Sequence, residues 1–253
     1  MNIFQGKGNV SLTQKICLSG ILIALVAILQ KIIAINYLPG FPYFRISFGG
    51  PALIIFASIF LGPFWGGLVG FSSDLFGYFV FDASGTVYLP QISVIYFVLG
   101  FASYYIFDII SKIKNHKILL IIETISFAIL LLGITAYIVF ISEIDLLFKI
   151  LIPIGLLLLF CGLEIFTIKY KSETEILYPT KTISFSSFIT DFVILVLFGS
   201  LMKTWAFLIY YDDPFSLWKL VIVAQTLVMF FNVMFNTAIL SLFLRASKKY
   251  IIK

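Results

Sequence analysis

A few charged side chains fall inside long apolar runs, where polar groups are rare enough to mark candidate functional sites. Asp74 lies midway along a run that ends near residue 81, and Lys203 stands in LMKTWAFL. Arg45, the second residue of FRISFGGP, lies at the edge of the run that begins near residue 47. If the runs span a membrane, Arg45 and Lys203 lie near outer ends, where two cations would suit a ligand with a carboxylate. They could equally extend toward the membrane surface, and Asp74 could serve helix packing through a hydrogen bond.

Glu123, Glu164 and Asp191 are the one credible set of acids that an intramembrane enzyme could use. No HExxH, GxSxG, P-loop or paired-cysteine spacing accompanies them. The single histidine, His116, lies in a lysine-rich loop, away from these acids. We therefore expect no enzymatic activity, no metal site and no cofactor. Glu123 and Glu164 could pair with polar neighbours or with each other.

The elements that position these residues are membrane spans. The chain has 253 residues, of which 61% are hydrophobic and 11% charged, whereas a soluble domain carries about 25% charged residues. A helical span needs roughly 20 mainly apolar residues. We predict one all-α integral membrane domain over residues 1–253, a bundle of about eight spans with Gly62-Pro63 separating the second and third. The apolar runs lie at about 14–35, 47–62, 64–81, 90–111, 118–141, 149–168, 184–210 and 217–246.

The distribution of charge in the loops predicts the orientation of the spans. Most of the 17 lysines and arginines fall in the N-terminal segment, in SKIKNHK, in the loop 169–181 and in the C-terminal tail. The alternate loops are acidic, with Asp82, Glu143 and Asp212 among their residues. Because positive residues gather on the cytoplasmic side, we expect a multi-pass protein of the cell membrane with both termini in the cytoplasm. The net charge of +5 is then no sign of nucleic-acid binding.

Small residues mark a face of the first span. Gly20 and Ala24 are one turn apart, with Ala27 almost a turn further on. Such residues let membrane helices approach closely, either within the bundle or against a partner subunit, and the same two possibilities hold for the glycines of LGPFWGGLVGF. Cys17 and Cys161 lie in apolar runs, and we interpret them as small buried hydrophobic residues rather than as a disulfide or metal pair.

At this point the sequence resembles a known family. The stretch FRISFGGPALIIFASIFLGPFWGGLVGFSSDLFGYFVF resembles the hallmark region of S components of energy-coupling factor (ECF) vitamin transporters, with a basic residue, a Phe-Gly pair, an apolar helix, Gly-Pro, a glycine-rich turn and an Asp-Leu pair. The stretch GTVYLPQISVIYFVLG is similar to the Gly-x-Tyr-Phe-Pro-Gly-Phe-Thr stretch of the folate-specific branch, and KTWAFLIYY loosely resembles that branch's Asn-Thr-x-Trp/Leu stretch.

The resemblance covers residues 14–111 well and 190–240 weakly. It implies a six-helix core, whose first four helices occupy 14–111 and whose last two occupy 184–246. The hairpin at about 118–168 has no counterpart in the family and is predicted to be an addition.

The resemblance also implies a function. The chain would be the substrate-binding subunit of an ATP-driven importer, with a folate as the expected vitamin, captured at an outward-facing pocket. It would work in the lipid bilayer with a membrane scaffold subunit and two cytoplasmic ATPases, and Gly20, Ala24 and Ala27 would form the face that docks on the scaffold. The implied substrate-binding residues are Arg45, Tyr88, Gln91, Lys203, Trp205 and Gln225.

Three departures from the folate pattern keep other ligands open. Gln91 replaces the glycine that follows Pro90, Lys203 stands where asparagine is usual, and residues 221–224 read Val-Ile-Val-Ala where an arginine is expected. Riboflavin, pantothenate or a queuosine precursor are therefore alternatives within the same class. An ion-driven transporter, which would be expected to show an inverted repeat with paired broken helices, and an intramembrane enzyme are alternatives from other classes.

Overall fold

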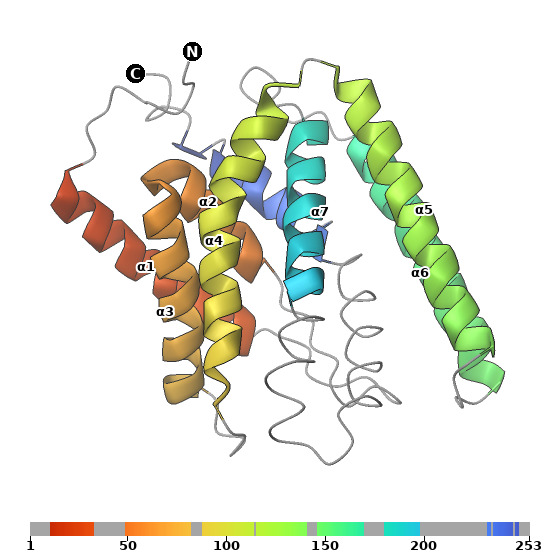
Figure 1. Cartoon of the computed structure of the whole chain (residues 1–253), viewed down its shortest axis with the longest axis horizontal. Helices are drawn as coiled ribbons and strands as arrows, with labels where there is room; N and C mark the ends of the chain where they lie inside the picture. The colour runs from red at the N-terminus through yellow and green to blue at the C-terminus, as the bar shows by residue number, and fades with distance from the viewer. Residues whose placement is uncertain are drawn as a thin grey trace.

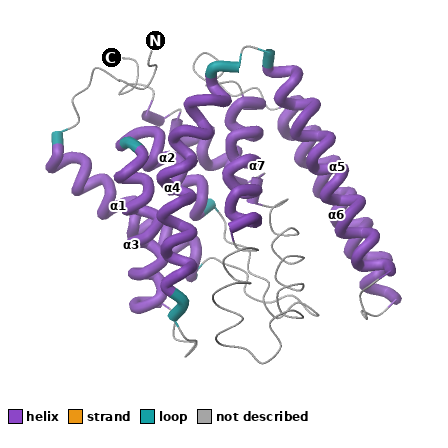
Figure 2. The backbone as a smooth tube through the Cα atoms, in the orientation of Figure 1, coloured by secondary structure: helices purple, strands orange, loops and turns teal. Residues whose placement is uncertain are grey.

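The chain folds as a bundle of α-helices. The computed structural model describes residues 11–32, 49–81, 88–113, 115–140, 146–169, 180–197, 232–233, 235–244 and 246–247, and all regular structure in these ranges is helical (Figures 1 and 2). This confirms the all-α prediction. The helices are α1 (Leu12–Lys31), α2 (Gly50–Leu61), α3 (Pro63–Phe81), α4 (Pro90–Ser111), α5 (His116–Phe140), α6 (Leu146–Lys169) and α7 (Thr180–Leu197), followed by a C-terminal segment, Phe235–Leu244.

Local sequence signals explain where several helices begin and end. Ser11 caps α1, because its Oγ accepts a hydrogen bond from the Gln14 backbone N–H while Gln14 Oε1 accepts one from the Ser11 N–H; this is a capping box. Gly62 ends α2 with a φ of 106°, a conformation that favours glycine. Pro63 and Pro90 each begin a helix, where a missing N–H costs nothing. The predicted break between the second and third spans is thereby confirmed.

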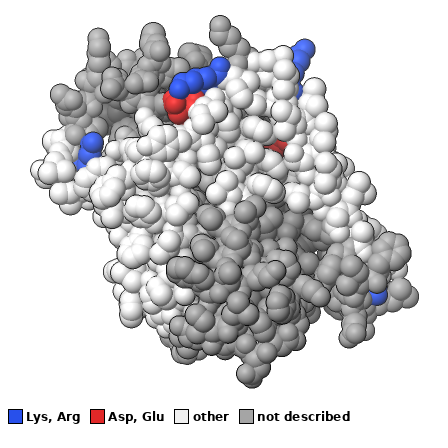
Figure 3. Space-filling model, in the orientation of Figure 1, with Lys and Arg blue, Asp and Glu red and all other residues white. Residues whose placement is uncertain are grey.

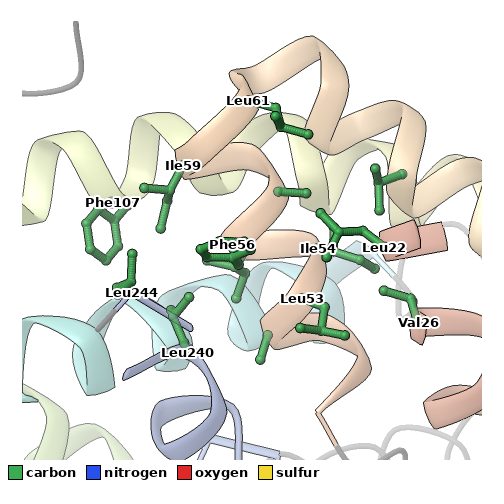
Figure 4. Packing of buried hydrophobic residues seen from close by; sticks show 14 of the residues in the cluster. Leu22, Val26, Leu53, Ile54, Phe56, Ile59, Leu61, Phe107, Leu240 and Leu244 are labelled. Carbon is green, nitrogen blue, oxygen red and sulfur yellow. The ribbon is translucent and has the colours of Figure 1, made fainter. Parts of the chain in front are cut away.

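The hydrophobic core is built around α2. Every residue of α2 except Phe60 is buried, as expected for a helix that is apolar all round. Figure 4 shows Leu22 and Val26 of α1 on one side of α2, with Leu240, Leu244 and Phe107 on another. Ile183 of α7 belongs to the same cluster. Helices α1, α3 and α4 each pack directly on α2, so this short helix is the element around which the first half of the chain is arranged.

Glycines bring α3 and α4 into backbone contact. A Cβ at Gly100 would lie 2.1 Å from the Gly66 carbonyl oxygen, and one at Gly70 would lie 2.2 Å from the Tyr96 carbonyl oxygen. A Cβ at Gly67 would lie 2.9 Å from the Phe97 ring. Small residues permit such close approach between membrane helices. The glycine-rich stretch after residue 61 therefore packs within the subunit, and the register that it sets between α3 and α4 positions the site described below.

The hairpin of α5 and α6 packs on the rest of the bundle through α7. The rings of Phe127 on α5 and Phe188 on α7 lie 4.7 Å apart between centroids. Glu123 of α5 is 1% exposed, and its Oε1 accepts a hydrogen bond of 2.5 Å from Ser184 Oγ of α7. Figure 1 shows the hairpin at the side of the bundle, away from α1. An aromatic contact and a polar contact thus help to attach the hairpin to α7.

The surface of the bundle is that of a protein in lipid. Helices α5 and α6 expose isoleucines and leucines along their whole length, among them Ile129, Leu132 and Leu158 at 63%, 66% and 68%. Soluble proteins rarely expose contiguous apolar patches of this extent. In Figure 3 the charged atoms of the described residues lie mostly near helix ends, and most of the other described surface in this view is uncharged. Within the described part of the chain, α1 and α4 are long and apolar enough to cross a membrane.

The prediction that the two cysteines are buried was wrong. Cys17 and Cys161 are free thiols, and both are exposed on the protein surface rather than buried. In a lipid-facing helix the outer surface is as apolar as the interior, so an apolar surrounding sequence does not distinguish a buried position from an exposed one.

Candidate functional site

Two of the six predicted substrate-binding residues lie in the described part of the chain, and both are located at the start of α4. Tyr88 precedes this helix by two residues and Gln91 is in its first turn. Figure 1 places the start of α4 beside the end of α3, with the end of α1 at the same side of the bundle. The other four, Arg45, Lys203, Trp205 and Gln225, lie outside the described residues.

A chain of three polar side chains crosses from α4 to α3 beneath Tyr88. The Tyr88 hydroxyl lies 2.6 Å from Ser93 Oγ, and Ser93 Oγ donates a hydrogen bond of 2.6 Å to Asp74 Oδ2. Ser93 is 0% exposed and Asp74 is 6% exposed. Asp74 therefore makes a buried hydrogen bond, which was one of its two possible roles in the sequence analysis. Its partner, Ser93, links it to Tyr88, a predicted substrate-binding residue. Buried polar networks of this kind hold their members in one arrangement.

Aromatic rings surround the outer end of this network. The Tyr88 ring lies 4.9 Å from that of Tyr78 and 5.6 Å from that of Phe79, between centroids. Tyr88 and Tyr78 are partly buried, while Phe79 is 70% exposed. Tilted rings at these separations attract one another, and a planar ligand ring could stack on the same side chains. The structure thus joins Tyr88 to two aromatic residues of α3 that the sequence analysis did not select.

Lys31 is a further member of the cluster that the sequence analysis missed. Its Nζ lies 6.0 Å from the centroid of the Tyr78 ring, at the outer limit of a cation–π contact. Its side chain crosses α3 at Gly77, where a Cβ would lie only 2.9 Å from Lys31 Cγ. A lysine at the end of a span has the ordinary interpretation of a side chain that reaches the interface. The sequence signal that could have identified Lys31 is Gly77, the residue before Tyr78. A glycine at this position leaves room for a long side chain to cross α3.

Gln91 brings a partly buried amide to the same end of α4. Its Oε1 is shielded from solvent and has no hydrogen-bond partner among the residues that the structure describes. A buried polar atom without a partner costs on the order of 1–3 kcal/mol, so such an atom is a candidate contact for a bound ligand. Gln91 lies three residues after Tyr88 in sequence, and both residues stand at the same end of the α3–α4 pair.

Of the three acidic residues considered for an intramembrane enzyme, only Glu123 has a side chain that the structure describes. Glu123 bonds to Ser184 in the contact between α5 and α7. The side chains of Glu164 and Asp191 lie outside the described residues, as does that of His116. Glu123 thus takes part in helix packing, and it is remote in sequence from the Tyr88 cluster.

The predicted docking face on α1 is divided by the packing. Gly20 and Ala24 are exposed, and no atom lies within 4 Å of the place where a Gly20 Cβ would stand. Ala27 is 0% exposed and belongs to the interior. Two of the three predicted residues are therefore accessible to another protein, and Ala27 is not.

Comparison with known families bears on this arrangement. Residues 10–155 match the family described as "ECF-type riboflavin transporter, S component". The match covers more than half of the chain and includes α1 to α5, hence Lys31, Asp74, Tyr78, Tyr88 and Ser93. Searches of curated proteins and of solved structures found no match.

Proposed function

The chain belongs to the family of ECF-type riboflavin transporter S components, and from this premise we propose that it captures riboflavin through the residues around Tyr88. Membership makes it a membrane-embedded subunit that binds the substrate of an ECF vitamin transporter, and the family is one of transporters rather than enzymes. The observation that carries the proposal is the family match, because its range contains every helix of the Tyr88 cluster.

Riboflavin is the first ligand to test, because the family description names it. The aromatic residues Tyr78, Phe79 and Tyr88 support a planar heterocycle, which would stack on such rings. A folate is the second candidate, favoured by the resemblance of GTVYLPQISVIYFVLG to the folate branch. Pantothenate has no aromatic ring, and the cluster gives no support for it.

The proposed binding residues are those of the sequence analysis, with Lys31 added. Tyr88 and Gln91 support the assignment through their common position at the start of α4, and Gln91 Oε1 supports it as a buried atom with no hydrogen-bond partner among the described residues. Lys31 adds a positive charge at the same end of the bundle. Arg45, Lys203, Trp205 and Gln225 remain predicted ligand contacts.

The proposed assembly contains a membrane scaffold subunit and two cytoplasmic ATPases. The exposed pair Gly20 and Ala24 supports a docking face on the first half of α1. The proposed orientation places the Tyr88 end of the bundle outside the cell. The lysine-rich ends, where Lys112 and Lys117 are exposed, then face the cytoplasm.

The test is calorimetric titration of the detergent-purified protein with riboflavin, folic acid, a reduced folate and pantothenate. We expect one-to-one binding of riboflavin, which the variant Tyr88→Leu weakens by at least about tenfold because the ring and its hydroxyl are both lost. Tyr105→Leu is the matched control, since Tyr105 lies on the same helix, is 47% exposed and stands near the opposite end of α4 from Tyr88.

If the protein bound a folate and not riboflavin, a folate would take the place of riboflavin as the assigned ligand. Equal affinities in Tyr88→Leu and Tyr105→Leu would remove Tyr88 from the site. A folded protein that binds none of the four compounds would contradict the proposed ligand class.

A further inference from the structure

The hydrogen bonds beneath Tyr88 have a fixed direction. Ser93 carries one hydroxyl proton, and that proton is donated to Asp74 Oδ2. The contact of 2.6 Å between Tyr88 Oη and Ser93 Oγ must then be made with the Tyr88 proton. The phenol proton therefore points inward to Ser93, and the lone pairs of Tyr88 Oη are left for other partners.

Ser93 differs in this respect from its neighbours among the buried serines of α3 and α4. Ser103 donates to the carbonyl oxygen of Gly100, and Ser73 donates to that of Gly70, so both bond within their own helices. Ser93 instead bonds across the α3–α4 contact. Hydrogen bonds to carboxylates are about twice as strong as those between neutral groups. The bond to Asp74 thus sets the direction of the whole chain.

We propose that Ser93 is a positioning residue that makes Tyr88 a hydrogen-bond acceptor toward the ligand, so that the site selects a ligand presenting an N–H or O–H group there. This rests on the proposed function and deepens it, because it names the chemistry that the ligand must show to one residue. A ligand with a carbonyl oxygen at that place would face the lone pairs of Tyr88 and gain no hydrogen bond. Riboflavin offers two kinds of donor, the ring N3–H and the hydroxyls of its side chain.

The direction of the hydrogen bond can be measured without a ligand. The intensity ratio of the tyrosine Raman doublet separates a phenol that donates a hydrogen bond from one that accepts. The difference spectrum between wild type and Tyr88→Phe isolates the Tyr88 signal, which we expect to be that of a donor. In Ser93→Ala the signal should change, and in the matched control Ser103→Ala it should not. A Tyr88 signal that is unchanged in Ser93→Ala overturns the proposal.

The consequence for the ligand is measured by affinity. Riboflavin, 3-methylriboflavin (ring donor blocked) and lumiflavin (hydroxylated side chain absent) are titrated into wild type, Tyr88→Phe, Ser93→Ala, Ser93→Thr and Ser103→Ala. We expect Tyr88→Phe to weaken riboflavin binding by roughly fivefold, the worth of one neutral hydrogen bond. Ser93→Ala should weaken it by a smaller factor, because Tyr88 keeps its hydroxyl but loses the partner that fixes its direction. Ser93→Thr keeps the hydroxyl and should restore the affinity. One of the two analogues, 3-methylriboflavin or lumiflavin, lacks the donor group that faces Tyr88. For that analogue, Tyr88→Phe and Ser93→Ala should have the same affinity as wild type.

The outcomes separate the two levels of inference. An equal loss with all three flavins shows that Ser93 has only a structural role and overturns the proposal, as does an undiminished affinity in Ser93→Ala. A wild type that binds folic acid and no flavin contradicts the riboflavin assignment. In that case the Raman result still decides the direction of the Tyr88 hydroxyl.

Discussion

The backbone contact between α3 and α4 gives the sharpest test of how the site is positioned. Gly100→Ala would place a Cβ 2.1 Å from the Gly66 carbonyl oxygen, 2.4 Å from the Gly66 carbonyl carbon and 2.8 Å from the Gly67 nitrogen. An ordinary contact begins at 3.4 Å. The atoms that would be met belong to the backbone of α3, so no side chain can turn aside. The two helices would have to move apart by about 1.3 Å, the difference between 3.4 and 2.1 Å.

The expected cost follows from the chemistry of overpacking. An extra methyl in a well-packed interior costs roughly 1–3 kcal/mol, and we expect the upper part of this range because backbone must move. For a chain of about 250 residues, 1 kcal/mol corresponds to roughly 2–4 °C in Tm. We therefore expect Gly100→Ala to lower the apparent Tm in detergent by about 5–10 °C, measured by far-UV circular dichroism, which reports helix content.

Gly133→Ala is the matched control for this measurement. Gly133 also lies inside a helix, but nothing stands within 4 Å of the place where its Cβ would be. Replacement of a mid-helix glycine by alanine gains roughly 0.5–1 kcal/mol, so the control should keep or raise the Tm. If Gly100→Ala unfolded at the same temperature as Gly133→Ala, the close approach of α3 and α4 would be refuted, and with it the register that brings Ser93 to Asp74.

Two further predictions concern the hairpin and the docking face. Ser184→Ala removes the hydrogen bond to Glu123 and should destabilise the protein by about 1 kcal/mol; Ser186→Ala, whose hydroxyl bonds within α7 to the Thr182 carbonyl oxygen, should cost less, and equal melting curves would contradict the role of the pair. A bulky residue on the exposed half of α1, as in Gly20→Leu, should abolish co-purification with the scaffold and ATPase subunits while leaving vitamin affinity unchanged. Gly133→Leu on the hairpin is its control, and assembly that survives Gly20→Leu would remove this face from the interface.

Sequence patterns predict the helices here because a membrane span constrains its own length. The run expected at 90–111 coincides with α4 (Pro90–Ser111), and the break at Gly62 coincides with a glycine in a conformation unfavourable for other residues. The structure describes only parts of the last two apolar runs, at about 184–210 and 217–246, so the full extent of these runs as spans stays a prediction. The length of an apolar run indicates where a span lies, because every span must be apolar on the side facing lipid as well as on the side facing the bundle.

The contacts of the site could not be predicted in the same way. The bond between Ser93 and Asp74 joins residues 19 apart on antiparallel helices, and it depends on a register set by glycine contacts one and two turns away. Asp74 was recognised as a costly intramembrane acid, but a sequence gives no information on which hydroxyl it meets. Cys17 was misjudged for a related reason, since in a lipid-facing helix both the exposed and the buried side are apolar.

The stripe of α1 that carries Gly20 shows how the packing angle of one helix divides a sequence pattern between two roles. At about 100° per residue, Gly20, Ala24, Ala27 and Lys31 fall within about 60° of one another around the helix. Yet Gly20 and Ala24 are exposed, Ala27 is buried, and Lys31 crosses α3 at Gly77. Figure 1 explains the difference, because α1 is inclined and its first half diverges from α3 while its second half passes behind it. The first half of α1 is therefore available to a partner, whereas the last turn carries Lys31, which contacts Tyr78. Because the two regions lie at different ends of the helix, a variant at Gly20 should disturb assembly without disturbing the capture of the vitamin.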